Sequence, residues 1–285
     1  MGGTPKDSHL WSTADLVAGM TQAHAEAVAA VQACADQLEA AIEAALPRLQ
    51  AGGRLIYIGA GTSGRIAAQD GNELLPTFNW TFGRAVTLMA GGLQAFHKPV
   101  EAAEDNADAA RAEMRALTPT PQDVAIGVAA SGTTTYTMAA LEEAKAAGAL
   151  ALAVCNRANS PIADLADIAI VAETGAEFVH GSTRMAAGTA QKVALNTFST
   201  GVMIRLGRVY KGHMVEMPPT NAKLEARAKM IVANVSGSSD ADAAAALAAT
   251  NGSVKLAIVM LAKGVDATEA RRLVDQAGGA LRDVL

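Results

Sequence analysis

Apolar residues recur at helical spacing through the first part of the chain. Residues 13–50 are rich in Ala, Leu, Val and Glu, and the segment closes at Pro47 and the pair Gly52-Gly53. Spacing of this kind is typical of amphipathic helices, and Pro and Gly are typical of helix ends. The pattern therefore predicts one or two helices over residues 13–50.

Short apolar runs separated by helical stretches follow in the middle of the chain. Alternation of this kind indicates a parallel sheet wrapped by helices. Such sheets bind ligands at the carboxyl ends of their strands, where the loops lead into helix N-termini with free backbone N–H groups. The predicted strands are Arg54–Ile58, Ala85–Ala90, Val124–Ala129, Ala149–Val154 and Ile168–Val171.

The second half of the chain has a different pattern. Ser182–Leu206 predicts a long helix that begins from a polar loop, and Met217-Pro218-Pro219 then interrupts the chain. Beyond this break, Ala-rich helical stretches without a strand-like run are divided by Ser236–Ser239, Asn251-Gly252, Gly264 and Gly278-Gly279. We interpret the chain as N-terminal helices over residues 1–50, an α/β domain over 51–217 and a small helical subdomain over 218–285.

Composition and charge narrow the class of protein. A chain of 285 residues with 51% hydrophobic content can bury a large core. The net charge of -5 and the lack of a basic cluster argue against a nucleic-acid partner. The first residues do not resemble a secretory signal, and no window approaches the roughly 18 apolar residues of a membrane span. Cys34 and Cys155 fall on apolar segments, which indicates buried thiols and a reducing cytoplasm.

The loop after the first predicted strand is suited to an anion. Gly59-Ala60-Gly61-Thr62-Ser63-Gly64 formally matches the dinucleotide-binding pattern. A dinucleotide site also needs an acidic residue at the end of the second strand, whereas that run ends in Ala90-Gly91-Gly92. Thr62 and Ser63 add hydroxyls to the N–H groups at the helix start, which favours a phosphomonoester. A dinucleotide site and a purely structural turn remain the alternatives.

A second hydroxyl-rich loop follows the third predicted strand. Ser131-Gly132-Thr133-Thr134-Thr135 precedes a predicted helix over Tyr136–Ala147. Helix capping would need one of these hydroxyls but not four, so capping alone is the alternative to ligand binding. Neither loop has a Lys in a Gly-Lys-Ser/Thr arrangement. The pair of loops therefore favours holding a phosphorylated metabolite over transferring phosphate from a nucleotide.

A third polar segment lies at the start of the long predicted helix. Ser182, Thr183 and Arg184 lie around that start, and Lys192 lies further along the helix. The hydroxyls of Ser182 and Thr183 could bind the substrate, and the two cations could neutralise its anionic groups. The alternative is a solvated cationic face, because charged side chains on helices are usually exposed.

The candidate general acids and bases are carboxylates, since His, Cys and acidic residues do not cluster at metal-binding spacings. Glu73 lies near the end of the helix that starts at the first loop, directly before Leu74-Leu75-Pro76. Glu101 and Glu104 are three residues apart and would share one face if their segment forms a helix. Taken alone, the spacing of that pair is more typical of a solvated acidic face.

These segments resemble the sugar isomerase (SIS) superfamily of phosphosugar-binding domains, and within it the N-acetylmuramic acid 6-phosphate etherases. The resemblance covers roughly residues 45–285 and follows the family order. It rests on GGRLIYIGAGTSGR, the Glu-xx-Pro-Thr-Phe turn at Glu73, AEDNAD, VAIGVAASG, GSTRMAAGTAQK, LNTFSTGVMIRLGRVY, TNAKL, NGSVKLAIVML and ATEARRLVDQAGG. It implies a doubly wound α/β SIS domain of about five parallel strands with a helical, UBA-like C-terminal subdomain.

The resemblance also implies an activity. Members of this family convert N-acetylmuramic acid 6-phosphate to N-acetylglucosamine 6-phosphate and D-lactate, without a cofactor and as homodimers. Glu73 matches the family's acid/base at the lactyl ether, and Glu104 matches its second catalytic carboxylate. About nine helical residues at 1.5 Å each separate Glu73 from the first loop by roughly 13 Å, which is far for one hexose phosphate. We therefore predict a site completed by the second subunit across a two-fold interface.

Within the matched segments, the chain departs from the family pattern at three places. Thr133 stands where the family has Arg, Ala187 stands where it has Lys, and Leu74-Leu75 replaces Cys-Pro. Two cations that could face an anionic ligand are thus replaced. The alternatives to the etherase are a non-catalytic regulator that binds a sugar phosphate, and an etherase or aldose–ketose isomerase acting on a different sugar phosphate.

Overall fold

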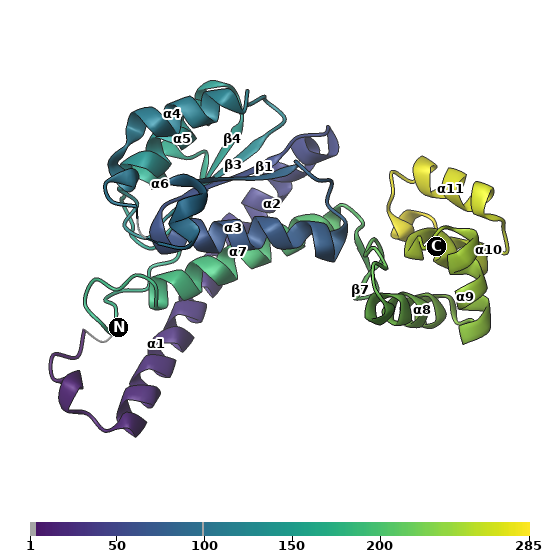
Figure 1. Cartoon of the computed structure of the whole chain (residues 1–285), viewed down its shortest axis with the longest axis horizontal. Coiled ribbons are helices and arrows are strands. Elements are labelled where there is room, and N and C mark those ends of the chain that lie inside the picture. Colours follow the sequence, from purple (N-terminus) through teal and green to yellow (C-terminus); the bar gives the residue numbers. More distant parts are fainter. Residues whose placement is uncertain (1–3, 99) are drawn as a thin grey trace. The chain divides into compact units, whose positions relative to one another are not determined.

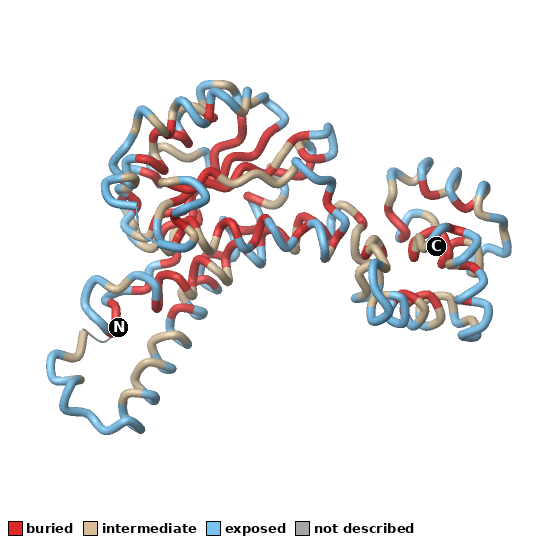
Figure 2. Tube along the Cα trace, in the orientation of Figure 1, coloured by how far each residue is buried: buried red, intermediate tan, exposed pale blue. Residues whose placement is uncertain are grey.

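The computed structural model describes residues 4–98 and 100–285. The described chain forms two compact units (Figure 1). Unit 1 comprises the residues up to Asn72 together with Gly83–Ser199, and unit 2 comprises Glu73–Phe82 together with Thr200–Leu285. In unit 1 the buried positions concentrate in the sheet and in the helix faces turned toward it (Figure 2).

Two helices occupy the N-terminal region, as the apolar spacing predicts. A short 3₁₀ turn, η1 (Ser8–Leu10), precedes α1 (Thr13–Gln32) and α2 (Ala35–Gln50). Ser12 begins α1 as its N-cap, because its side chain accepts a hydrogen bond from the backbone N–H of Asp15. Pro47 was expected to end the segment but lies inside α2, whose last residue is Gln50.

The sheet of unit 1 has five parallel strands in the order β2-β1-β3-β4-β5. β1, β3 and β4 are buried along their whole length, which explains their continuous apolar runs. The predicted strands and fold class are confirmed. The strands are β1 (Leu55–Gly59), β2 (Ala85–Met89), β3 (Val124–Ala129), β4 (Leu150–Cys155) and β5 (Ile168–Val171).

Helices cover both faces of this sheet (Figure 1). One face carries α4, α5 and α6, whose Ala, Leu and Met side chains pack on β1, β3 and β4. The other face carries α2 and the beginnings of α3 and α7. The bounds are α3 (Gly61–Phe78), α4 (Ala107–Ala116), α5 (Thr135–Ala146), α6 (Pro161–Leu165) and α7 (Ala186–Arg205), with 3₁₀ turns η2 (Gly92–Phe96) and η3 (Ala103–Asp105).

A buried carboxylate connects the sheet to two of its helices. Asp70 of α3 is 1% exposed and accepts hydrogen bonds from Tyr57 Oη (2.8 Å), Ser199 Oγ (3.1 Å) and Asn196 Nδ2 (3.2 Å). Burial raises the pKa of Tyr57 well above its usual value, and the Asp70 charge and hydrogen bond add to this effect. Tyr57 therefore stays a phenol donor, and the network fixes α3 and α7 against β1.

The amino-terminal edge of the sheet is held by an ion pair. Asp123 precedes β3 and accepts hydrogen bonds from the backbone N–H, Nε and Nη2 of Arg54, which precedes β1. Burial acts to raise the pKa of Asp123, but the hydrogen bonds from Arg54 and from the Thr120 N–H outweigh it, so that the pKa is lowered. Asp123 is therefore a carboxylate that fastens two adjacent strands.

Unit 2 is mostly helical. A short antiparallel hairpin, formed by β6 (Val209–Tyr210) and β7 (His213–Met214), comes first. Four helices follow it and pack around an apolar core of unit 2. Gly237 and Gly264, at two of the predicted breaks, adopt left-handed conformations that end α8 and α10. The helices are α8 (Ala222–Ser236), α9 (Asp240–Ala249), α10 (Val254–Lys263) and α11 (Ala267–Gln276), followed by η4 (Leu281–Asp283).

Unit 2 also includes the C-terminal end of α3. Arg208 Nη1 donates to the carbonyls of Phe78 (2.7 Å) and Asn79 (2.9 Å), and its guanidinium lies 5.0 Å from the centre of the Trp80 ring. Within the described residues no single helix has the length and apolar character of a membrane crossing, although α9 and α10 would meet that test together across a 118° bend.

Candidate functional site

The strand order places the hydroxyl-rich loops at one point of the sheet. The chain runs from β1 outward to β2 and then returns to β3 on the other side of β1. Gly59 of β1 pairs with Val128 of β3, so the loops that follow these strands leave the sheet side by side. In open parallel sheets, the crevice at such a reversal of strand order is where ligands bind.

The glycines of the first loop allow α3 to begin very close to the sheet. Gly61 has a φ of 53°, and a side chain at Gly64 would lie 2.3 Å from Met89 Sδ and 2.7 Å from the Gly59 carbonyl oxygen. The loop thus meets a packing requirement that any helix this close to β1 would impose. Ser63 is buried beneath the loop and Thr62 is half-buried at its surface.

A cavity of about 330 Å³ opens beside this loop and is here called the Glu104 cavity. Gly61, Thr62, Glu101 and Glu104 are among its lining residues. Arg65, which also lines it, donates from Nε and Nη2 to the carbonyl of Ala95 at 3.1 and 2.7 Å. The structure therefore brings Glu104 together with the first loop.

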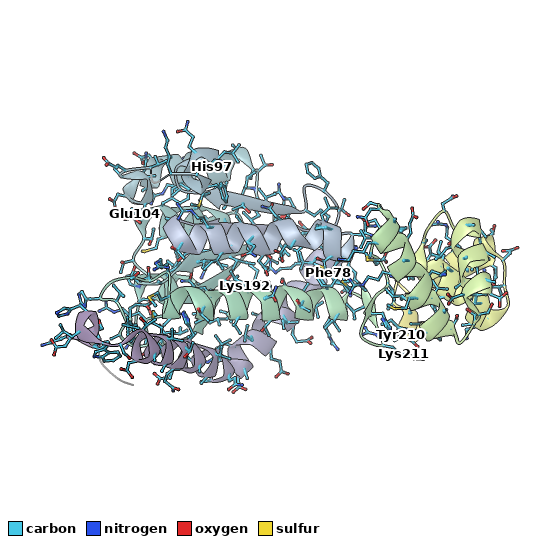
Figure 3. The ribbon with its side chains drawn as sticks, turned by 60° about the horizontal axis from the view of Figure 1, so that its bottom comes forward. Phe78, His97, Glu104, Lys192, Tyr210 and Lys211 are labelled. Carbon is cyan, nitrogen blue, oxygen red and sulfur yellow. The ribbon has the colours of Figure 1, made fainter. Side chains whose placement is uncertain are left out.

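The acidic pair does not lie on an α-helix. Glu101 lies in a turn, and Glu104 lies in η3, which is entered through Ala102 at a φ of 57°. Both side chains are exposed and line the same cavity. The two residues do not share an α-helical face, because the chain forms a tight 3₁₀ turn there, and α4 begins only at Ala107. Figure 3 shows Glu104 with its side chain.

The hydroxyls of the second loop do not cap the helix that follows it. Gly132 has a φ of 70°, and a side chain there would lie 2.3 Å from Ser160 Oγ. Ser131 Oγ accepts from the backbone N–H of Thr133 (3.2 Å) and lies 2.9 Å from Thr133 Oγ1. Thr134 is the N-cap of α5, but its side chain makes no capping hydrogen bond. Capping therefore does not account for this group of hydroxyls.

A larger cavity, here called the Arg157 cavity, opens beside the second loop. It measures about 520 Å³ and lies where the loops after β3, β4 and β5 converge. Its lining includes Ser131, Asn156, Arg157, Glu173 and Thr183. Ser131 and Thr183, both predicted as ligand-binding residues, thus face one cavity, and Thr62 faces the other.

A buried glutamate holds the beginning of α7. The carboxylate of Glu177 is bound by the backbone N–H groups of Ala186 (2.9 Å) and Ala187 (3.0 Å), and the residue is 8% exposed. The helix was expected from Ser182, but it begins at Ala186, because Ser182, Thr183 and Arg184 form the turn leading into it. Lys192 is half-buried in α7 (Figure 3) and belongs to the described lining of neither cavity.

Glu73 lies on α3, nine residues after Gly64, and belongs to unit 2. Its side chain is exposed, whereas the next residue, Leu74, is 2% exposed. The predicted helical position of Glu73 is thus observed, and its role stays a prediction.

Some residues of the site were missed by sequence reasoning. Asn156 and Arg157 directly follow β4, and the rule that ligands bind after parallel strands could have identified them. Arg65 stands within the first motif but was not singled out. Glu177 gave no local signal, because only the fold brings its carboxylate to a helix start nine residues later.

Comparison with known families matches the α/β region of the chain. The glucokinase regulatory protein N-terminal SIS domain matches residues 37–145, and the SIS domain matches residues 93–200. A solved phosphoheptose isomerase from Francisella tularensis superposes with a TM-score of 0.51 at 16% identity, covering 68% of this chain and 98% of that one. At this identity the likeness shows the fold alone.

Relatives with higher identity cover nearly the whole chain. An N-acetylmuramic acid 6-phosphate etherase from Deinococcus radiodurans is 49% identical over 271 residues, which are 95% of this chain and 88% of that protein. An N-acetylmuramic acid 6-phosphate etherase from Streptomyces coelicolor is 45% identical over 271 residues, covering 95% of this chain and 87% of that protein. The likeness thus extends through both units.

Proposed function

The chain belongs to the N-acetylmuramic acid 6-phosphate etherases, and on this basis we propose that it is a carbon–oxygen lyase that releases D-lactate from N-acetylmuramic acid 6-phosphate. The other product is N-acetylglucosamine 6-phosphate, which suits a role in amino-sugar and peptidoglycan recycling. The observation that carries the proposal is the 49% identity with an etherase across 95% of the chain. The two free, buried thiols suit a reducing cytoplasm, where we expect the protein to act.

The reaction consists of proton transfers and one elimination. Opening of the sugar ring exposes an aldehyde at C1, which acidifies the proton on C2. Removal of that proton forms a C2–C3 double bond while the C3–O bond breaks, and the departing lactate oxygen takes up a proton. Water then adds across the double bond, giving a hydroxyl at C3 and returning a proton to C2. Two carboxyl groups that exchange protons can carry these steps.

We assign the proton transfers to Glu73 and Glu104. Glu73 removes the C2 proton and delivers a proton to the C3 oxygen, and Glu104 assists ring opening or the addition of water. The position of Glu104 supports its role, because it lines a cavity together with Gly61 and Thr62 of the first loop. Backbone N–H groups and hydroxyls at a helix start are suitable ligands for the anionic and hydroxyl groups of the substrate.

The position of Glu73 supports a homodimer. Nine helical residues separate it from Gly64, a distance of about 13 Å along α3. A single hexose phosphate held at the start of α3 does not span that distance. We infer that Glu73 serves a site completed by the second subunit at a two-fold interface.

The test is the release of D-lactate from N-acetylmuramic acid 6-phosphate by the purified protein. We expect Glu73→Gln and Glu104→Gln each to lower turnover by about 100- to 10,000-fold, because proton transfer by a positioned group contributes that much. Both variants should still bind N-acetylglucosamine 6-phosphate. Glu39→Gln, on the exposed side of α2, is the matched control and should keep the parent's turnover.

The outcomes separate the proposal from its alternatives. Lactate from the parent but not from Glu73→Gln would support the etherase and its acid/base together. A parent that binds the sugar phosphate but releases no lactate would instead indicate a sugar-phosphate regulator or a different substrate. An isomerised sugar phosphate as product would indicate an aldose–ketose isomerase. Sedimentation of a fully active monomer would contradict the shared site.

A further inference from the structure

Arg157 brings an unengaged cation to the functional edge of the sheet. It lies two residues after the end of β4 and lines the Arg157 cavity with Ser131 and Thr183. Its side chain is exposed, and no described residue forms a hydrogen bond or an ion pair with its guanidinium. A guanidinium offers several N–H donors in a planar fork that matches the oxygens of phosphate.

The backbone that carries Arg157 is fixed by its neighbours. Asn156 Nδ2 donates to the carbonyl of Ala172 (2.9 Å), and Asn156 Oδ1 accepts from Gln191 Nε2 (3.0 Å). Gln191 belongs to α7 and is 1% exposed. The start of the loop is therefore tied to the segment after β5 and to α7, so that Arg157 projects from a held position.

The same cavity also has neutral donors near it. Ser131 lines it with its hydroxyl, and α5 begins four residues later at Thr135 without a capping side chain from Thr134. At α7 the equivalent N–H groups are already bound by the Glu177 carboxylate. The donors at the start of α5 thus remain for an external anion.

The distribution of acidic groups separates the two cavities. Glu101 and Glu104 both expose carboxylates to the Glu104 cavity, where no described guanidinium is as free as Arg157, since Arg65 is bound to Ala95. In the Arg157 cavity Glu177 is occupied by α7, which leaves Glu173 as the exposed acid. Each lining carries two glutamates and one arginine, but the Arg157 cavity combines a single exposed carboxylate with a guanidinium that is free to bind an anion.

We propose that Arg157 binds the phosphate group of the substrate, in a subsite completed by the Ser131 hydroxyl and the first N–H groups of α5. The reacting end of the sugar then lies toward Glu104. This inference deepens the proposed function and rests on it, because that function supplies the phosphorylated ligand.

The test measures binding of N-acetylglucosamine 6-phosphate, the proposed product, by isothermal titration calorimetry. We expect Arg157→Gln to weaken binding by about 10- to 100-fold, as expected when a charge-assisted hydrogen bond is lost. Arg157→Lys should recover part of the affinity, because it restores the charge but not the fork. Arg271→Gln, an exposed arginine of α11, is the matched control and should bind like the parent.

Two further readouts distinguish phosphate binding from a structural role. The melting temperature of Arg157→Gln should equal that of the parent. Its KM for N-acetylmuramic acid 6-phosphate should rise, whereas its kcat should stay within about threefold of the parent's, because the lost contact binds ground state and transition state alike. Unphosphorylated N-acetylglucosamine should bind parent and Arg157→Gln equally.

Equal affinity of the parent and Arg157→Gln for the sugar phosphate would overturn the subsite. A fall in kcat with unchanged product affinity would overturn it too, since the cation would then act at the lactyl carboxylate. Lactate release by the parent is measured in a separate assay, so that the reaction and the phosphate subsite are tested independently. A parent that releases no lactate, yet loses sugar-phosphate binding on Arg157→Gln, would refute the reaction and support the subsite.

Discussion

Replacement of Glu177 by Gln tests whether its buried carboxylate holds the functional edge together. In the parent, both carboxylate oxygens accept from N–H groups at the start of α7, at 2.9 and 3.0 Å. The amide of Gln can keep one of these hydrogen bonds, but its NH₂ group cannot accept the other. One buried N–H then loses its acceptor, which costs about 1–3 kcal/mol. Loss of the charge at the helix start costs about 0.3–2 kcal/mol more.

The sum predicts a destabilisation of about 1–5 kcal/mol, which corresponds to a melting temperature lower by about 3–20 °C. Differential scanning calorimetry of the parent, Glu177→Gln and Glu39→Gln measures this change. Glu39 is exposed on α2, so Glu39→Gln should stay within about 0.5 kcal/mol of the parent. A Glu177→Gln protein that melts within 1 °C of the parent would refute the reasoning, because the N–H groups of α7 would then be satisfied without the carboxylate.

Two further predictions concern the core of unit 1. The pKa of Asp123 is lowered in the folded protein, where the carboxylate is paired with Arg54. The pair therefore stabilises the fold at pH values above the unfolded-state pKa of about 3.9, and this stabilisation is lost as the pH falls through the pKa of Asp123 in the folded protein. Urea midpoints at pH 7 and pH 3.5 should therefore differ more for the parent than for Asp123→Asn, and an equal loss in both proteins would contradict the assignment. Burial raises the pKa of the Cys34 and Cys155 thiols. Iodoacetamide at neutral pH should therefore alkylate them slowly in the folded protein and rapidly in urea, as followed by mass spectrometry. Rapid labelling of the folded protein would contradict their burial.

The fold could be predicted because its signals are local. Runs such as Val124–Ala129 are apolar throughout, since the strand is covered on both faces, and this holds whatever the ligand is. Turn residues such as Gly237 and Gly264 end helices through a backbone conformation that favours glycine. These requirements act over a few residues, so a single sequence contains them.

The site was predicted only in part, because cavities join loops that are distant along the chain. Thr62 and Ser131 could be identified because their loops are rich in hydroxyl residues. The local sequence does not show that the two residues line different cavities. Glu104 was identified through the family resemblance, because its spacing from Glu101 alone is typical of a solvated acidic face. In the sequence, Arg157 cannot be distinguished from any other surface arginine. It lines a cavity because three loops converge in the folded protein.

The interrupted course of unit 2 has a consequence for how the protein is made. Phe78 is synthesised well before Arg208, the residue that binds its carbonyl, and 130 residues separate them. At about 5–20 residues per second, the ribosome needs on the order of ten seconds to deliver that partner. During this interval the Trp80 ring lacks the guanidinium that later lies over it. Unit 1 is itself complete only at Ser199, so the end of α3 lacks its partner for nearly the whole time in which the rest of unit 1 is being synthesised.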